Sequence, residues 1–293
     1  MIRDQKHIHI FILSVVIFSL LGGCSRTQLF YHQLDWLIPR YINHYISLNN
    51  QQSNALDQQT EVFLQWHCAK HTGKYAQWFM QLKQDVQNNR IDSNKLELHS
   101  SELHSYWLEL VDQFVPGLAT ILYSVNDKQT LELIYNLTEK NQELFEELVE
   151  LSPSEAEEEL VERMEDRFDT WLGSVRKEQL KAIKTWAKIT QSRQRIRLLM
   201  RERWTNRLHH LLLYRDNEQA FVKNVHMLIR NPEHTWTESY RKQFAQARAD
   251  TLKLLLYTLN NLSSKQRTHL FKHLDKWARD MRAISCNSKI VTT

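Results

Sequence analysis

Histidine pairs are the first residues in this sequence whose spacing could support chemistry. His67 and His71 are four residues apart, as are His269 and His273. Residues four apart lie on one face of a helix, and two imidazoles placed in this way can hold a divalent metal ion. No His-Glu-x-x-His motif accompanies them. We therefore interpret them as ordinary surface or half-buried histidines, and we expect no metal and no cofactor.

Glycine scarcity excludes most familiar catalytic loops. The chain of 293 residues has 5 glycines and 4 prolines, with 42% hydrophobic and 25% charged residues. This composition can bury a core and is not that of a disordered chain. A P-loop, a dinucleotide-binding turn and a nucleophile elbow each need glycines at fixed positions, and these motifs are missing. The prediction is a protein that is not an enzyme.

The amino-terminal residues contain the most specific motif. Arg3 and Lys6 precede an apolar run from Ile10 to Leu21, which ends in Gly22-Gly23-Cys24. The run is too short to span a bilayer, and this order of regions is typical of a signal peptide. It resembles a bacterial lipoprotein signal peptide that is cleaved between Gly23 and Cys24. An uncleaved membrane anchor with an incidental cysteine is the alternative.

The lipoprotein resemblance implies an acylated Cys24, carrying palmitate among its chains. Stable anchoring needs more than one acyl chain, and lipoproteins have three. Ser25 stands where inner-membrane retention signals usually have Asp, which favours the outer membrane and a body facing the periplasm. We expect four segments: signal peptide 1–23, lipidated tether 24–33, all-helical domain 34–285 and carboxyl-terminal tail 286–293.

Two further cysteines, Cys68 and Cys286, remain after lipidation of Cys24. An oxidising periplasm would permit a disulfide between them. Such a bond would close a loop of over 200 residues, worth up to about 5 kcal/mol on the chain-entropy model. Two separate thiols are the simpler interpretation, and both remain open.

Apolar residues recur every three or four positions along the body, which predicts helices throughout. A short polar residue followed three positions later by Gln or Glu marks a helix start. The pattern occurs at Asn49 with Gln52, Ser152 with Glu155 and Ser263 with Gln266. The basic stretch after Gly173, to about Tyr214, predicts one long helix. We expect an all-α fold, a single elongated bundle of about eight or nine helices.

Charge is separated along the chain. Residues 139–169 contain 13 acidic and three basic side chains, whereas residues 176–215 contain 12 basic and two acidic ones. The simpler interpretation is two neighbouring antiparallel helices whose faces attract. The functional interpretation is a docking face for an anionic partner such as phospholipid, lipopolysaccharide or an acidic protein patch. That face would comprise Arg193, Arg195, Arg197 and Arg203. The net charge of +4 is too mild to indicate nucleic acid.

Several phrases of the chain resemble an uncharacterised family of Gram-negative lipoproteins. They are Leu34-Asp35-Trp36-Leu37-Ile38, Tyr41, Tyr45, Leu48 to Gln52, Trp66-His67 and Leu262 to Arg267. The resemblance implies an all-helical envelope protein and no assigned function. Two phrases, Leu48 to Gln52 and Leu262 to Gln266, also resemble the Leu-Thr-x-x-Gln motif of small periplasmic stress chaperones.

These observations predict a membrane-anchored periplasmic lipoprotein that binds a partner or has a structural role in the cell envelope. The alternative is a chaperone-like holder of unfolded periplasmic polypeptides. A chaperone of this kind would need an exposed apolar concavity of several hundred Å².

Overall fold

The computed structural model describes residues 26–286, and all regular structure in this range is helical. The signal peptide, Gly23 and Cys24 lie outside the described residues. The α-helices are α2 (Arg26–Tyr31), α3 (Leu34–Asn43), α4 (Asn50–Gln87), α5 (Ser93–Tyr123), α6 (Asp127–Glu150), α7 (Pro153–Leu172), α8 (Lys177–Gln191), α9 (Gln194–Leu213), α10 (Glu218–Arg230), α11 (Glu238–Asn260) and α12 (Ser264–Ala283). A 3₁₀ turn, η2 (Pro232–Thr235), separates α10 from α11.

Residues 26–286 form eleven α-helices, more than the eight or nine expected. One additional helix is α2, which lies inside the segment 24–33 expected as a tether. The other arises because the long basic segment breaks at Ser192 and Arg193 into α8 and α9. Ser192 Oγ donates to Ile189 O at 3.0 Å, and Arg193 Nη1 donates to Asp250 Oδ2 at 2.8 Å. This break lets α8 pack on α7 and α11 while α9 packs on α6 and α10.

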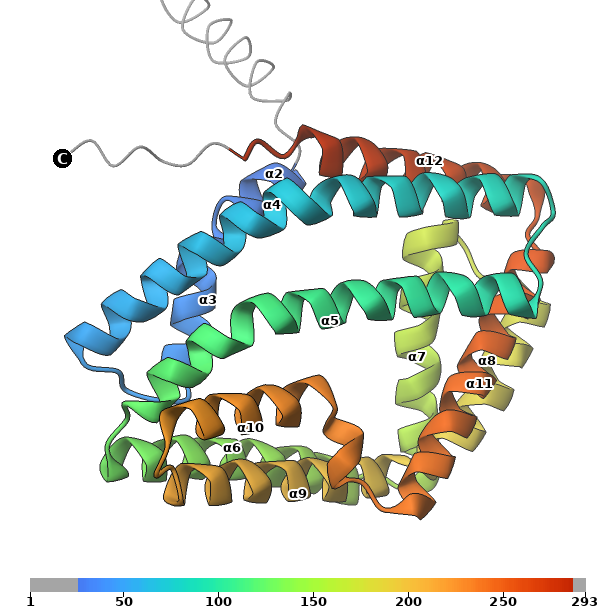
Figure 1. The fold of residues 1–293 in the computed structure, drawn as a ribbon. Coiled ribbons are helices and arrows are strands. Elements are labelled where there is room, and N and C mark those ends of the chain that lie inside the picture. The colour runs from blue at the N-terminus through green and yellow to red at the C-terminus, as the bar shows by residue number, and fades with distance from the viewer. Residues whose placement is uncertain (1–25, 287–293) are drawn as a thin grey trace, which may run out of the picture.

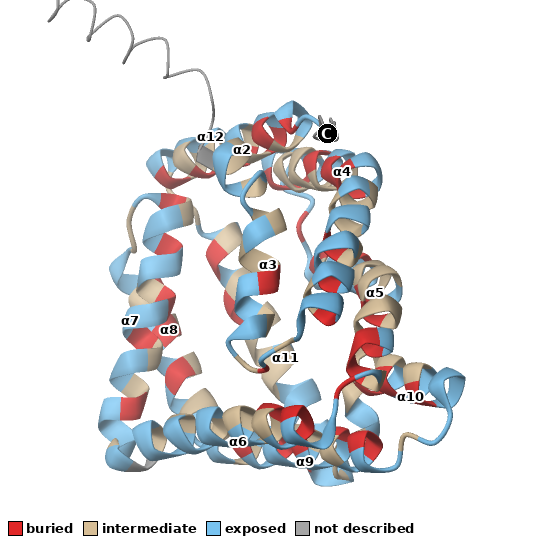
Figure 2. Cartoon of the chain, turned by 90° about the vertical axis from the view of Figure 1, so that its left-hand side faces the viewer, coloured by how far each residue is buried: buried red, intermediate tan, exposed pale blue. Residues whose placement is uncertain are grey.

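The helices follow the edges of a closed frame and do not form the single elongated bundle expected from the sequence (Figures 1 and 2). Helices α2 and α12 lie on the upper edge in both views, α4 descends from that edge, and α6 and α9 form the lower edge. Helices α7, α8 and α11 connect these edges on one side, while α5 packs on α4, α10 and α11. Within residues 26–286 no helix combines the length and apolarity needed to cross a bilayer.

Two hydrophobic cores stabilise the frame at different places. One core joins α5, α6, α9 and α10 through side chains such as Val115, Leu212 and Val225. The other joins the end of α4 to α7, α8, α11 and α12 around Phe168, Ile183 and Leu274. Buried apolar area is the main stabilising term in folding, so each core can fix its own group of helices. The charged and polar faces of the helices remain exposed.

Each core contains a buried pair of glutamines, which we call a glutamine pair. Gln52 and Gln129 exchange amide hydrogen bonds of 3.3 and 2.7 Å, and Gln179 and Gln266 exchange bonds of 3.4 and 2.7 Å. Each glutamine oxygen also accepts from the backbone N–H at the start of its own helix. The pairs therefore join the starts of α4 and α6, and of α8 and α12, across the fold.

The helix starts predicted at Asn49, Ser152 and Ser263 are confirmed, each with a complete capping box. Asn126 with Gln129 makes a further capping box that the sequence analysis missed. Helix α7 ends at Gly173, whose φ of 77° lies in the left-handed region that favours glycine. These local signals define where the helices begin and end.

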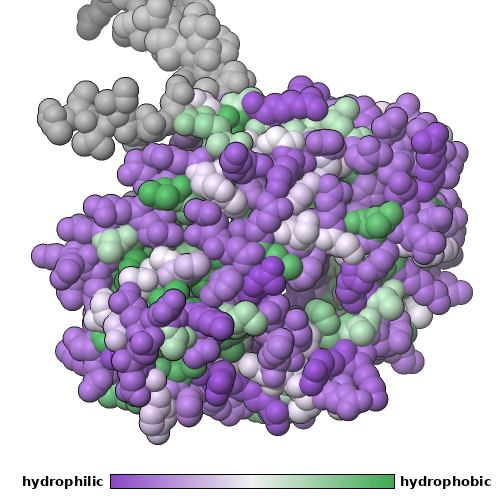
Figure 3. Space-filling model, viewed as in Figure 1, coloured by the Kyte–Doolittle hydropathy of each residue, from purple (hydrophilic) through white to green (hydrophobic). Residues whose placement is uncertain are grey.

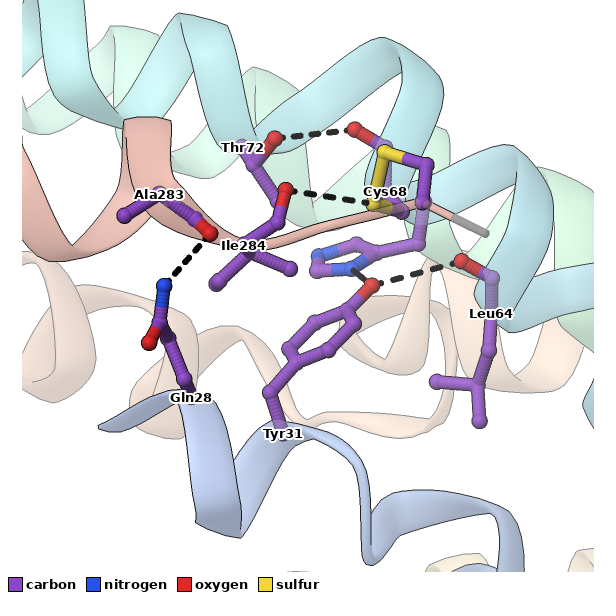
Figure 4. Close-up of a disulfide and its surroundings, with 9 residues drawn as sticks. Gln28, Tyr31, Leu64, Cys68, Thr72, Ala283 and Ile284 are labelled. Carbon is purple, nitrogen blue, oxygen red and sulfur yellow. Dashed lines mark hydrogen bonds between the residues drawn. A yellow bond between two sulfur atoms is a disulfide. The ribbon is translucent and has the colours of Figure 1, made fainter. Parts of the chain in front are cut away.

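A disulfide joins Cys68 on α4 to Cys286 beyond the end of α12 (Figure 4). The sequence left open whether these cysteines form a disulfide or remain two separate thiols, and the structure contains the disulfide. The bond attaches residue 286, the first of the expected carboxyl-terminal tail, to the body. The dashed line from Ile284 to Cys68 marks a contact of 4.0 Å between the Ile284 carbonyl oxygen and the Cys68 sulfur. This contact is not a hydrogen bond, because a disulfide sulfur has no hydrogen to donate. Lys83 Nζ bonds to both oxygens of Asp275 at 2.8 Å farther along the same pair of helices. Helices α4 and α12 therefore run antiparallel.

Candidate functional site

The candidate site is built by α9 and by the chain that turns back over it. Pro232 follows Asn231 at the end of α10, and proline cannot donate the backbone bond that would continue the helix. The resulting turn η2 packs on α9 and α10. Trp204 of α9 donates its indole N–H to Leu228 O at 3.2 Å, and Thr235 Oγ1 donates to Pro232 O at 2.7 Å. The first bond joins α9 to α10 and the second lies within the turn, which packs on α9 beside its arginines.

The first hollow has a volume of about 420 Å³ and lies between α9, α10 and η2. Its polar lining consists of side chains that can donate hydrogen bonds: Arg203, Arg207, Asn224, Asn231, His234 and Thr235. Arg203 and Arg207 are exposed and four residues apart, so they lie on one face of α9. None of the lining residues is acidic. The hollow therefore concentrates positive charge without an internal counter-ion.

The second hollow, of about 290 Å³, lies between α6, α9, η2 and the start of α11. Arg197 and Arg201 line it together with the rings of Trp204, Trp236 and Tyr240. Arg201 Nε donates to Asn141 Oδ1 at 3.1 Å, so this guanidinium has a defined position. Burial raises the pKa of Tyr240, and the nearby charge of Arg197 partly offsets that rise. This hollow combines arginine with aromatic surface, and again no lining residue is acidic.

Together the two hollows form what we call the arginine surface. Guanidinium groups donate in a planar fork that fits carboxylate or phosphate oxygens. Glu202 and Glu233 are acidic residues on α9 and η2, but both are exposed and neither lines a hollow. The surface therefore offers the donors that suit an anion, with aromatic side chains available for apolar contacts.

The structure separates the four arginines predicted as an anion-docking face. Arg197 lines the second hollow and Arg203 lines the first. Arg195 is exposed but lines neither. Arg193 is bonded to Asp250 at the corner between α8 and α9, so it has a structural role. The sequence analysis missed Arg207, although its spacing from Arg203 was a local signal, and missed His234, which only the fold brings close.

The acidic and basic segments are neighbours, as the simpler interpretation requires: α7 packs on α8, and α6 packs on α9. Between residues 139–169 and 176–215, however, the described chain has no ion pair. Buried side chains such as Phe168 and Ile183 join the helices instead. Charge attraction between these segments is therefore long-range at most.

The histidine pairs do not assemble into one site. His67 stacks on His71 with ring centroids 5.6 Å apart, and His269 stacks on His273 at 4.8 Å. His67 and His71 lie in the middle of α4 beside the end of α12. His269 and His273 lie in the first half of α12, beside the end of α4. The helical rise per residue therefore separates the two pairs by roughly 20 Å. Across residues 26–286 no three His, Cys, Asp or Glu side chains gather as metal ligands.

His67 belongs to a hydrogen-bonded group that packs α2 on α4. The Tyr31 hydroxyl lies 2.9 Å from His67 Nδ1, and Tyr75 OH lies 3.2 Å from Nε2 (Figure 4 shows Tyr31). Burial and the neighbouring His71 lower the pKa of His67 to about 4. Burial, with the other charges nearby, raises the pKa of Tyr31 and of Tyr75 to about 12. These groups are neutral near pH 7, which suits a packing role.

The fold and site define an all-helical protein with an arginine-lined surface. The chain belongs to a family of unknown function, DUF6279, whose model matches residues 44–241. This range contains α4 to α10, η2 and therefore both hollows. The expectation of an uncharacterised family is confirmed. No curated protein and no solved structure matches the chain.

Proposed function

We propose that this protein is a lipid-anchored, non-catalytic protein of the cell envelope that binds an acidic protein through the arginine surface. The observation that carries the proposal is the pair of hollows lined by arginine and lacking acidic residues. Arginine, tryptophan and tyrosine are also the residues that dominate the binding energy of protein interfaces. Trp236, Tyr240 and the arginines of α9 supply this combination.

The position of the arginine surface favours a protein over the anchoring membrane as its partner. Figures 1 and 2 both place α2 on the upper edge of the frame and α9 on the lower edge. Cys24 is two residues before Arg26, a chain length of at most about 7 Å. Acylation of Cys24 would therefore hold the α2 edge at the outer membrane. The arginine surface would face the periplasm, away from the phospholipid or lipopolysaccharide of that membrane.

A chaperone-like holder of unfolded polypeptides is the second candidate. It depends on the resemblance of Leu48 to Gln52 and Leu262 to Gln266 to a chaperone motif. In this fold Gln52 and Gln266 are buried in the glutamine pairs, so these phrases have a structural explanation. Figure 3 shows hydrophilic residues over most of one face, with hydrophobic residues in separate patches. This face offers no continuous apolar cradle, which favours the binding protein.

Charge reversal and crosslinking in cells test the proposal. A photoreactive residue replaces His234, which lines the first hollow, in otherwise native protein and in the double variant Arg203→Glu/Arg207→Glu. We expect one dominant envelope protein to be crosslinked, and affinity for it to fall at least about tenfold in the double variant, equivalent to 1.4 kcal/mol. Added salt should weaken the binding in the same direction.

Arg195→Glu is the matched control for the single variant Arg203→Glu, because it reverses one charge on the same helix outside both hollows. It should reduce binding much less than a reversal at Arg203. Equal losses from both positions would show that general charge, and not the hollows, recognises the partner. Crosslinking of many unrelated periplasmic chains would favour the chaperone, and crosslinking to lipid alone would contradict the proposed partner class.

A further inference from the structure

Helix α2 packs on the body through polar groups and exposes its apolar side chains, the reverse of an ordinary surface helix. Thr27 Oγ1 donates to Asp280 Oδ2 at 2.8 Å, and the Gln28 amide donates to Ala283 O. Tyr31 OH donates to Leu64 O at 3.3 Å (Figure 4). Leu29 and Phe30 remain 57% and 58% exposed. The packed face of α2 is thus built from polar contacts, while its apolar face is uncovered.

Trp36, near the start of α3, is a further exposed apolar side chain in the chain that follows α2. Its side chain is 56% exposed, and the Arg40 guanidinium lies 5.3 Å from the centre of its ring. A tryptophan with an adjacent cation is typical of the boundary between a bilayer and water, where the ring contacts lipid and the charge stays hydrated. Arg279 and Arg282 on the last turns of α12, which packs on α2, are also exposed and could attract anionic headgroups.

We propose that Leu29, Phe30 and Trp36 form a membrane-contact surface, which inserts into the interfacial layer of the phospholipid bilayer that anchors Cys24. This inference rests on the lipid anchor of the proposed function. Leu29 is five residues after Cys24, so the intervening chain spans at most about 18 Å. A bilayer that holds the acyl chains is therefore within reach of this surface.

The membrane-contact surface would determine how the frame is oriented. A lipid attached to one residue leaves the body free to rotate, whereas a second contact through α2 and α3 restricts that rotation. With α2 against the bilayer, the arginine surface on the opposite edge of the frame faces away from it (Figures 1 and 2). The contact therefore presents the arginine surface to a partner at a fixed distance from the membrane.

Fluorescence quenching by brominated lipids tests the contact. The full chain is produced with Leu29→Cys, labelled with bimane and reconstituted in phosphatidylethanolamine–phosphatidylglycerol vesicles with brominated acyl chains. Leu131→Cys on α6 is the matched control, since Leu131 is 62% exposed on the opposite edge of the frame. We expect quenching at position 29 to exceed that at position 131 by at least about threefold, as for a residue buried in the interface.

Mass spectrometry of the amino-terminal peptide reports acylation separately. Equal quenching at both positions in acylated protein would overturn the membrane-contact surface and leave the lipid anchor intact. Stronger quenching at position 29 without acylation would support the surface and overturn the anchor. Absence of both acylation and vesicle binding would overturn both.

A second variant, Leu29→Ser/Phe30→Ser, keeps Thr27, Gln28 and Tyr31, so α2 should still dock on the body. Its thermal unfolding midpoint should match that of the native protein. Both surfaces are also compared in protein that carries Cys24→Ala. There, the protein with Leu29 and Phe30 should bind vesicles several-fold more strongly than the protein with Leu29→Ser/Phe30→Ser. Equal binding by the two would overturn the proposal. If a copurifying protein, and not lipid, covers position 29, the proposal that this surface contacts a bilayer would be overturned.

Discussion

His67 shows how a single residue depends on its surroundings in this fold. Its ring lies between the hydroxyls of Tyr31 and Tyr75 and stacks on His71. His71 is fully buried, and its ring nitrogens make no hydrogen bond, although Nε2 lies 3.4 Å from Glu109 Oε2. Burial lowers the pKa of both histidines. Neutral imidazoles are therefore part of the packing of α4, His67 against α2 and His71 against α5.

Acidification should destabilise the protein through His67. The pKa of His67 is about 4 in the folded protein, below the ordinary value of 6.5, so the unfolded chain takes up a proton at a higher pH than the folded protein does. The contribution of neutral His67 to the free energy of unfolding is complete above its pKa in the unfolded chain. It is lost as the pH falls from that value toward the pKa in the folded protein. We expect the urea midpoint to fall between pH 7 and pH 5, and to fall less in His67→Gln. An identical pH dependence in both proteins would contradict this origin.

Helices are joined in this fold at their starts as well as along their faces. Gln266 accepts from Ser263 N, donates to Ser174 O and exchanges bonds with Gln179. The buried side-chain amide of Gln266 therefore has hydrogen-bond partners for both its nitrogen and its oxygen. The pair made by Gln52 and Gln129 performs the same role in the other core. A capping residue that also bonds to a second helix start couples elements distant in sequence.

Gln266→Leu should destabilise the fold by about 2–4 kcal/mol, because it leaves Gln179, Ser174 O and Ser263 N without their buried partners. Urea denaturation followed by circular dichroism measures the change. Gln58→Leu, at an exposed position of α4, is the control and should stay within about 0.5 kcal/mol of the native protein. Similar small effects for both would show that the buried pair adds little to stability.

The disulfide acts on the whole molecule because it joins segments 218 residues apart. It fixes the end of α12 on α4 at the edge of the frame that also binds α2. A cross-link over so long a loop restricts the unfolded chain more than a short one. The closed frame and the disulfide therefore support each other.

Loss of the disulfide should lower the free energy of unfolding by up to about 5 kcal/mol. Chemical denaturation with and without reductant measures this in the native protein and in Cys286→Ser. Reductant should shift only the native protein, down toward the variant. A native midpoint that does not respond to reductant would show that the two thiols are unpaired in solution.

Sequence by itself determined the helical class and many helix starts, because periodicity and capping depend on residues within a few positions of one another. The capping boxes that begin at Asn49, Ser152 and Ser263 illustrate this. Asn126 with Gln129 has the same capping pattern, although the sequence analysis did not predict a helix start there from it. The break at Ser192 and Arg193 has neither proline nor glycine to mark it, and its ion pair with Asp250 joins residues 57 apart. One long helix was therefore the wrong prediction.

Tertiary structure alone decided the closed frame, the partners of the buried glutamines and the shape of the arginine surface. The sequence indicated a basic helix. Only the fold shows that Arg193 forms an ion pair with Asp250 and that His234 lines the same hollow as Arg203. The pairing of Cys68 with Cys286 was likewise open until α12 was placed on α4. Such contacts depend on how two separate cores orient distant helices, and short-range patterns in a sequence do not contain that orientation.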